Sequence, residues 1–206
     1  MKDKDKIILS KTLSYICRHG AEKEGIEINK EGGWIKIFDI LEYLNKKSKF
    51  NNVTNLDISN IVESCSKNRF SICVINNNEY IRANQGGSIK SVNLNFVELE
   101  IKDKNVKFYH GTNDDAANLI MNGLGLSKMK RTHIHMNDKM PNQGEIISGM
   151  RSSCTKIIII DVNKAIDLGV KFFISSNKVI LSEGITDKNS QHYGYIPTSC
   201  LTMIDR

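Results

Sequence analysis

The apolar residues of this chain change their spacing near residue 70, and that change limits the folds it can adopt. Before it, three stretches carry apolar residues at helical spacing, residues 9–16, 37–44 and 58–65. From Phe70 onward apolar and polar residues alternate, residues 76–78 predict a turn, and residues 79–83 predict a returning strand. Three short helices followed by a hairpin is the order of a winged-helix module, although fold order alone does not fix a function.

The second half of the chain is rich in expected strands. A helix with acidic residues in its first turn is predicted over residues 113–123, ending at Gly123. Strands are predicted at residues 107–112, 132–136, 156–162, 171–175 and 178–184. The apolar run 157–160 indicates a strand buried on both faces. We therefore expect an α+β protein with a helical lobe over 1–90, a linker over 91–106 and a β-rich lobe over 107–206.

Charge and composition narrow the class of partner. The chain has 206 residues and a formal net charge of +6, which favours a polyanionic partner such as RNA without requiring one. No apolar run is long enough to cross a bilayer, and the charged start predicts no secretory signal. The five cysteines are scattered, which fits reduced thiols. We expect an intracellular protein, in the cytoplasm or the nucleus. We also expect it to be a monomer that does not bind a membrane.

Arg18 and His19 stand side by side after the first predicted helix, where the chain turns at Gly20. Cations at a helix C-terminus favour the helix dipole, so this pair can be an ordinary solvated end. The same two side chains can also bind an anion, one with a fixed charge and one that titrates. For Arg69, at the start of the hairpin, the ordinary interpretation is a charge at a strand edge.

A histidine, a glycine and a threonine, His110, Gly111 and Thr112, end a predicted strand just before a helix. Glycine lets a ligand approach the backbone, threonine can cap the helix or bind a ligand oxygen, and a helix N-terminus favours anions. An ordinary strand–turn–helix with a satisfied histidine explains the same residues. The triplet alone favours the ordinary interpretation.

The segment Arg131 to His135 is denser in polar side chains. If it forms a strand, Arg131, His133 and His135 share one face. That face can be a metal site, a nucleotide pocket or a plain polar surface. No third and fourth ligand stand at a recognisable spacing, so we expect no metal.

Two further segments offer donors for a phosphate or pyrophosphate. One is the loop that contains Ser148, Gly149 and Arg151, and the other contains Asn177, just before the strand that starts near Val179. Each is equally compatible with a plain polar loop or turn. The sequence has no P-loop, no Rossmann glycine fingerprint and no nucleophile elbow, which removes several common enzyme classes.

Taken together, these segments resemble one family. LSKTLSYICRHGA, GGWIKI, RFSI, IRANQGGSIKSV, FYHGT, SKMKRTHIHM, ISGMRSS and NKVILSEGI occur in the order seen in the NAD-dependent RNA (tRNA-splicing) 2′-phosphotransferases. The resemblance runs from about Leu9 to about Ile196. It implies a winged-helix-like N-terminal lobe and a C-terminal lobe with the ADP-ribosyltransferase fold. It also implies transfer of an internal RNA 2′-phosphate to NAD, giving 2′-hydroxyl RNA, nicotinamide and ADP-ribose 1″,2″-cyclic phosphate.

The resemblance also implies roles for individual residues. The family's catalytic set corresponds to Arg18, His19, Arg69 and Arg131. Contacts with NAD correspond to two groups of residues, His110, Gly111, Thr112 and His133 in one, and Ser148, Gly149, Arg151, Asn177 and Val179 in the other. The chain departs from the family at Gly87, where a histidine is usual. Two alternatives remain: an ADP-ribosyltransferase that modifies nucleic-acid ends or protein, and a module that binds RNA or ADP-ribose without turnover.

Overall fold

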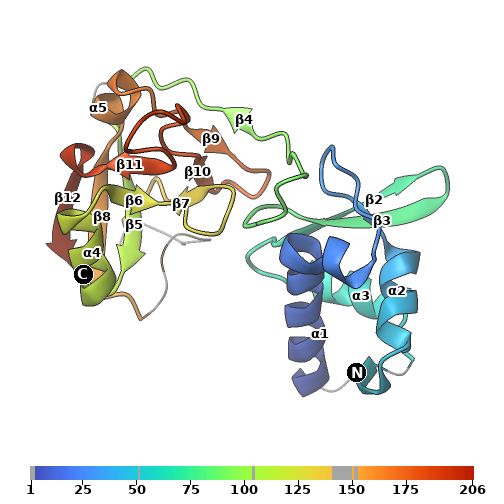
Figure 1. Ribbon diagram of the computed structural model, residues 1–206. Helices are drawn as coiled ribbons and strands as arrows, with labels where there is room; N and C mark the ends of the chain where they lie inside the picture. The colour runs from blue at the N-terminus through green and yellow to red at the C-terminus, as the bar shows by residue number, and fades with distance from the viewer. Residues whose placement is uncertain (1–2, 51, 104, 141–149, 151–152) are drawn as a thin grey trace. The chain divides into compact units, whose positions relative to one another are not determined.

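The computed structural model describes the chain except for residues 1–2, 51, 104, 141–149 and 151–152 (Figure 1). The chain divides into two compact units, unit 1 over residues 1–95 and unit 2 over residues 96–206. Both units combine helices with small sheets whose named strands pair antiparallel. The α+β class expected from the sequence is therefore confirmed. No helix in the described parts of the chain is long and apolar enough to span a membrane.

The described residues of unit 1 form three α-helices and a three-stranded sheet in the order β1-β3-β2 (Figure 1). Its α-helices are α1 (Asp3–Tyr15), α2 (Ile37–Asn45) and α3 (Asn55–Glu63). Its strands are β1 (Ile35–Lys36), β2 (Phe70–Ile75) and β3 (Asn78–Ala83). Short helical turns lie at η1 (Ile16–Gly20), η2 (Glu22–Glu24) and η3 (Ser48–Phe50). The predicted helices and hairpin are thus present, in the predicted order.

The local signals for these elements are visible in the contacts. Asn76 and Asn77 adopt left-handed backbone at the tip of the β2–β3 hairpin, as tight hairpin turns require. At the start of α3, Thr54 and Asp57 form a reciprocal capping box. The apolar faces of the three helices pack with the inner face of the sheet into one core.

The end of the first helix differs from the expectation. The chain does not turn out of the helix before Arg18 but continues through a π-helical turn, η1, which includes Arg18 and His19. Gly20 lies against the ring of Tyr15, where a Cβ atom would come within 2.4 Å of a ring carbon. Single π-turns are uncommon, and they occur often at functional sites.

The described part of unit 2 is built from strands and α-helices (Figure 1). The helices are α4 (Asp114–Asn122) and α5 (Val162–Asp167), with a short turn η4 (Thr198–Cys200). One sheet has the order β4-β9-β10-β7, with β4 (Val97–Glu98), β9 (Phe173–Ile174), β10 (Ile180–Ser182) and β7 (Ile134–Met136). A second sheet has the order β12-β8-β5, with β12 (Leu201–Asp205), β8 (Lys156–Asp161) and β5 (Lys107–Thr112). A third pairs β11 (Tyr195–Pro197) with β6 (Gly125–Ser127).

The core of unit 2 lies around the central strand β8, whose Ile157, Ile158 and Ile160 are buried as predicted. Tyr109 of β5 and Asn137, just after β7, exchange two backbone hydrogen bonds of 2.8 and 2.9 Å. This pairing joins the two larger sheets. It also sets the end of β5 beside the segment that carries the expected polar cluster.

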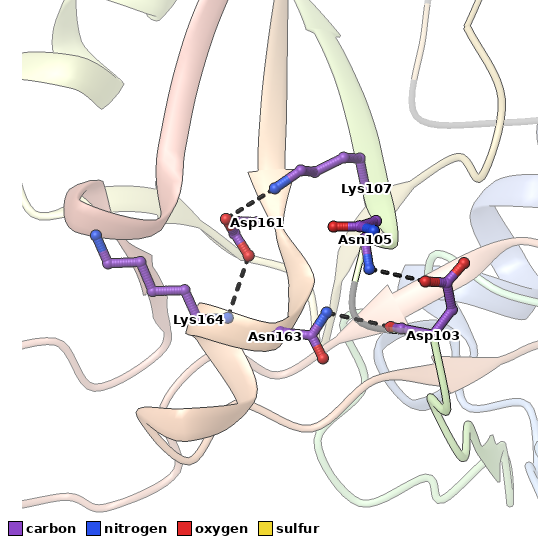
Figure 2. A network of polar contacts seen from close by, with 6 residues as sticks. All are labelled: Asp103, Asn105, Lys107, Asp161, Asn163 and Lys164. Carbon is purple, nitrogen blue, oxygen red and sulfur yellow. Dashed lines mark hydrogen bonds and ion pairs between the residues drawn. The ribbon is translucent and has the colours of Figure 1, made fainter.

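The base of β5 is fixed by a polar network (Figure 2). Asp161, at the end of β8, accepts a hydrogen bond of 2.7 Å from Lys107 Nζ and caps α5 by accepting from the Lys164 backbone N–H. The Lys107 hydrogen bond is the main cause that lowers the pKa of Asp161. Asn163 donates to the carbonyl of Asp103, so the segment before β5 is held to α5 as well.

Candidate functional site

In unit 1 the residues expected to bind phosphate all contact one short segment, residues 84–88. The Ser88 backbone N–H donates to the carbonyl of Arg18, and the Ser88 hydroxyl lies 2.8 Å from His19 Nδ1. Four residues before Ser88, the Asn84 backbone N–H donates to the carbonyl of Arg69. The segment that follows β3 therefore contacts three of the four expected catalytic residues.

Arg69 is held through both its backbone and its side chain. Its Nη1 atom donates to Cys65 Sγ at 3.3 Å. Burial raises the pKa of the Cys65 thiol, but hydrogen bonds and charge from Arg69 outweigh burial, so that the pKa is lowered. The buried Asn84 side chain donates to the carbonyl of Asn68 and accepts from the Ser71 hydroxyl. These contacts fix the turn that precedes β2.

Gly87 occupies the position where the resemblance leads one to expect a histidine. A Cβ atom added there would meet the carbonyl oxygen of Arg18 at 3.6 Å, which is an ordinary van der Waals distance. The backbone therefore has room for a side chain at Gly87. The next residue, Ser88, contacts His19 through its hydroxyl.

Unit 2 contains a cavity of about 720 Å³, which lies within the usual range for small-molecule sites. Polar side chains from β5, from the loop before β7, from β7 and from β11 line it, namely His110, Thr112, Arg131, His133, His135 and Tyr195. The strand predicted over residues 132–136 is shorter and begins at Ile134. Arg131 and His133 therefore reach the cavity from a loop and not from one strand face.

His110 has a defined tautomer. Its Nδ1 lies 2.8 Å from the carbonyl oxygen of His135, and because a carbonyl only accepts, Nδ1 carries the proton. Burial is the main cause that lowers the pKa of His110, and the charge of Arg131 adds to it. A neutral ring protonated on Nδ1 leaves the lone pair of Nε2 available to accept a hydrogen bond. His110 is thus suited to receive a hydroxyl proton of a ligand.

His133 lies in a second enclosed environment. Its ring makes edge contacts with Phe96 and Phe173, with ring centroids 5.0 and 6.0 Å apart. Burial lowers its pKa, which the carboxylate of Glu183 partly opposes. The ion-pair distance from His133 Nε2 to Glu183 is 3.8 Å. The imidazoles of His110 and His133, both with lowered pKa values, therefore line the same cavity.

His135 connects two other residues of the cavity. It is buried, its carbonyl accepts from His110, and its Nδ1 lies 3.4 Å from Arg131 Nη1. In the sequence its signal is the alternation with Arg131 and His133, which is compatible with a metal site, a nucleotide pocket or a polar surface. No group of three or more possible metal ligands occurs among the described residues.

Other expected site residues lie elsewhere or have other contacts. A Cβ atom on Gly111 would come within 2.3 Å of Met150 Cγ and 2.8 Å of Cys154 Sγ, so packing explains this glycine. Thr112 does not cap α4, because Asn113 does. Asn177 and Val179 are buried at the turn between β9 and β10, around the Ser175 hydroxyl.

Three more expected NAD contacts, Ser148, Gly149 and Arg151, lie outside the described residues. Neither Asn177 nor Val179 is among the described residues that line the cavity. The NAD contacts expected for all five residues stay predictions.

Comparison with known proteins gives a consistent result. The family model described as RNA 2′-phosphotransferase, Tpt1/KptA family, matches residues 4–184. The tRNA 2′-phosphotransferase 1 of Danio rerio is 39% identical over 180 residues, covering 85% of this chain and 77% of its own length. A protein of Schizosaccharomyces pombe, "putative tRNA 2′-phosphotransferase" by name, is 37% identical over 95% of this chain and 52% of its own. The tRNA 2′-phosphotransferase of Saccharomyces cerevisiae is 35% identical over 89% of this chain and 81% of its own.

Proposed function

This chain belongs to the RNA 2′-phosphotransferase family, Tpt1/KptA, and from that premise we propose that it removes an internal 2′-phosphate from RNA by transferring it to NAD. The substrate is a tRNA that carries the phosphate at its splice junction, as the names of the relatives support. The products are 2′-hydroxyl RNA, nicotinamide and ADP-ribose 1″,2″-cyclic phosphate. No metal takes part.

The two units take different parts in this proposal. Unit 1 is a winged-helix-like lobe that binds the RNA and its phosphate, which its order of three helices and a hairpin supports. Unit 2 is an ADP-ribosyltransferase-like lobe that binds NAD, which its cavity supports. These fold assignments rest on element order and on the resemblance of the motifs.

Arg18, Arg69 and Arg131 bind the phosphate oxygens. Guanidinium groups suit this task because they stay charged and donate in a planar fork, with about 1.5–3 kcal/mol for each charge-assisted hydrogen bond. They also stabilise the extra charge that develops on the phosphorus centre during transfer. His19, positioned by the Ser88 hydroxyl, moves protons to and from the RNA 2′-oxygen.

The cavity of unit 2 fits a nucleotide ligand on two observations. Its volume of about 720 Å³ is sufficient for a small molecule, and its imidazoles are uncharged donors and acceptors. His110, Thr112 and His133 would hold NAD there. When bound, NAD supplies the ribose carbon and hydroxyl that take up the phosphate. His110 orients a ribose hydroxyl through the lone pair on Nε2, and the surrounding apolar residues keep water away.

The observation that carries this proposal is the placement of the family's charged set. Arg18, His19 and Arg69 all contact the segment 84–88, and Arg131 lines the cavity that contains His110. A binding module without turnover has no need of this arrangement. An ADP-ribosyltransferase of other specificity needs the cavity but not the arginines of unit 1.

One assay tests the proposal. The protein is incubated with RNA that carries a single internal 2′-phosphate and with NAD labelled in the adenylate, and the products are separated by chromatography. We expect 2′-hydroxyl RNA, free nicotinamide and a labelled cyclic phosphate, in the presence of excess chelator. Label that stays on RNA or protein would support the alternative ADP-ribosyltransferase, and release of inorganic phosphate without loss of NAD would refute the proposal.

A further inference from the structure

Cations lie against aromatic rings on the outer side of the unit 1 sheet and at the start of α2, which directly follows β1. Lys36 Nζ lies 5.9 Å from the centre of the Phe38 ring, and the Arg82 guanidinium lies 4.6 Å from the centre of the Trp34 ring. Tyr80 is paired with Lys36 across the strands β1 and β3. We call these five residues, Trp34, Lys36, Phe38, Tyr80 and Arg82, the aromatic–cation face.

Strand alternation places the side chains from β1 and β3 on one side of the sheet, and Phe38, at the start of α2, joins them through its contact with Lys36. Ile35 and Ile81 are paired and completely buried in the core of unit 1, so their neighbours Lys36 and Tyr80 point to the opposite side. Arg82 lies one residue beyond Ile81 and points the same way. Phe38 is 60% exposed, and the other four residues are partly exposed.

The loop before β1 is shaped to place the indole ring. Gly32 and Gly33 both have left-handed backbone, with φ of 92° and 69°, which favours glycine at each position. A Cβ atom on Gly32 would lie 3.0 Å from the Trp34 ring, so the backbone approaches the indole closely. The carbonyl of Gly32 also accepts from Arg82 Nη1 at 3.4 Å. The turn thus positions both members of the pair.

The two cations of this face are not neutralised. Among the described residues, neither Lys36 nor Arg82 forms an ion pair, and Arg82 Nε is buried without a hydrogen-bond partner. A contrasting pair occurs in the same unit, where Lys47 lies over the ring of Tyr43 and is also paired with Glu24 at 3.7 Å. The charge of Lys47 is therefore neutralised by Glu24, whereas the charges of Lys36 and Arg82 are available to an anion.

We propose that the aromatic–cation face binds the single-stranded RNA that flanks the 2′-phosphate. Bases stack on Trp34 and Phe38, while Lys36 and Arg82 contact the backbone phosphates. This combination of flat rings and unpaired cations is the physical requirement for binding single strands with little sequence preference. The inference rests on the proposed function, because that function supplies the RNA, and it adds the surface on which the RNA lies.

Trp34 is the only tryptophan of the chain, so its fluorescence reports directly on this face. The full chain is titrated, without NAD, with a single-stranded RNA of about ten nucleotides that carries an internal 2′-phosphate, a length within the usual footprint of such surfaces. We expect the tryptophan emission to be quenched in parallel with binding measured by anisotropy of a labelled RNA. Equal quenching by polyglutamate would show a general acidic-partner site and overturn the proposal.

Variants test the stacking and the charge separately. Phe38→Ala should weaken RNA binding by about fivefold to 150-fold, the range that corresponds to one stacked base. Lys36→Gln should reduce the slope of log affinity against log salt by about 0.7, as expected for one phosphate contact. The matched control is Lys47→Gln, which removes a neutralised cation from the same unit and should leave binding and slope nearly unchanged.

The outcomes separate this inference from the function on which it rests. If wild-type protein leaves the 2′-phosphate in place with NAD present, the proposed function fails whatever the fluorescence shows. If the phosphate is removed and RNA binds by anisotropy, but Trp34 emission stays constant, the inference fails alone. The same holds if Phe38→Ala, with a far-UV spectrum like that of wild type, binds RNA as tightly as Lys47→Gln.

Discussion

The expected site histidines of the two units differ in exposure and in what holds them. His19 of unit 1 is exposed and contacts the Ser88 hydroxyl, while His110 of unit 2 is fixed by a backbone carbonyl and its pKa is lowered by burial. An exposed imidazole is accessible to a large ligand such as RNA. An enclosed, neutral imidazole suits a ligand whose hydroxyls need acceptors. The difference suits the two imidazoles to different tasks, although each unit also contributes arginines to the proposed catalytic set.

The largest expected effects come from removing one arginine from each unit. Arg18→Ala and Arg131→Ala should each slow removal of the 2′-phosphate by about 10²–10³, by analogy with the loss of one donor to a developing negative charge. The measurement is the initial rate at saturating NAD with 2′-phosphorylated RNA. Matched controls are Lys11→Ala in unit 1 and Lys164→Ala in unit 2, both exposed, and both should keep the wild-type rate.

If both arginine variants retain their apparent affinity for NAD, the result supports a role for both units in binding the phosphate. If Arg131→Ala alone loses activity, that role is contradicted for unit 1, because charge would then act on the phosphate from unit 2 only. A full loss of activity in either lysine control would mean that net charge, and not these positions, controls the rate.

The next effect is a change in the free energy of unfolding when a methyl group is added at Gly111 or at Gly87. Gly111→Ala should lower the free energy of unfolding by about 1–3 kcal/mol, because its Cβ would overlap Met150 and Cys154. Gly87→Ala meets its nearest neighbour at 3.6 Å and should change stability by less than about 0.5 kcal/mol. Urea denaturation of both variants gives the two values. Equal destabilisation would show that the segment 84–88 is packed as tightly as the end of β5.

Much of unit 1 was predictable from sequence because its signals are local. The helical stripes, the asparagine turn and Asp57 near the start of α3 each depend on neighbours within a few residues. The π-helical turn was not predictable, because it includes Arg18, whose carbonyl accepts a hydrogen bond from the Ser88 backbone N–H. The spacing of residues in a sequence does not reveal a contact between residues that are 70 positions apart.

Unit 2 was less predictable for the same physical reason. The short strands β4, β6 and β11 contain two or three residues each and exist because distant partners pair with them. Arg131, His133 and His135 line one cavity, as their alternation in the sequence indicates. Arg131 and His133 lie in the loop before β7, and His135 lies in β7. The role of the His135 carbonyl had no signal in the sequence, since any residue has a carbonyl.

A smaller effect is expected from the contact that positions His19. Ser88→Ala removes its hydroxyl partner and should lower the rate by about threefold to tenfold, which corresponds to a net hydrogen bond of about 0.5–1.5 kcal/mol. The control is Ser91→Ala, whose hydroxyl contacts Glu22 and not the candidate site. If the Ser88 variant changes the rate no more than the Ser91 variant, His19 is held by other contacts. Unit 1 would then resemble unit 2 in having a fixed imidazole.

The smallest effect separates the two units by their response to acid. The pKa values of His110 and His133 are lowered from 6.5, mainly by burial, so below that pH the unfolded state binds more protons than the folded state. Stability therefore falls in unit 2 as the pH drops through 6.5. Among the carboxylates of unit 1 the pKa is lowered for Glu24 and Asp57, whose ordinary pKa values are 4.5 and 3.8, so their contribution persists until the pH is lower still.

Hydrogen exchange at about pH 7.5 and pH 5.5, corrected for intrinsic rates, measures both units in one sample. Protection should fall in β5 and β8 of unit 2 and stay constant in α2 and α3 of unit 1. His133→Asn should reduce the fall in unit 2, because it removes one of the two groups that must take up a proton. An equal fall in both units would show that they unfold together, and the contrast between the exposed His19 and the enclosed imidazoles of unit 2 would not extend to stability.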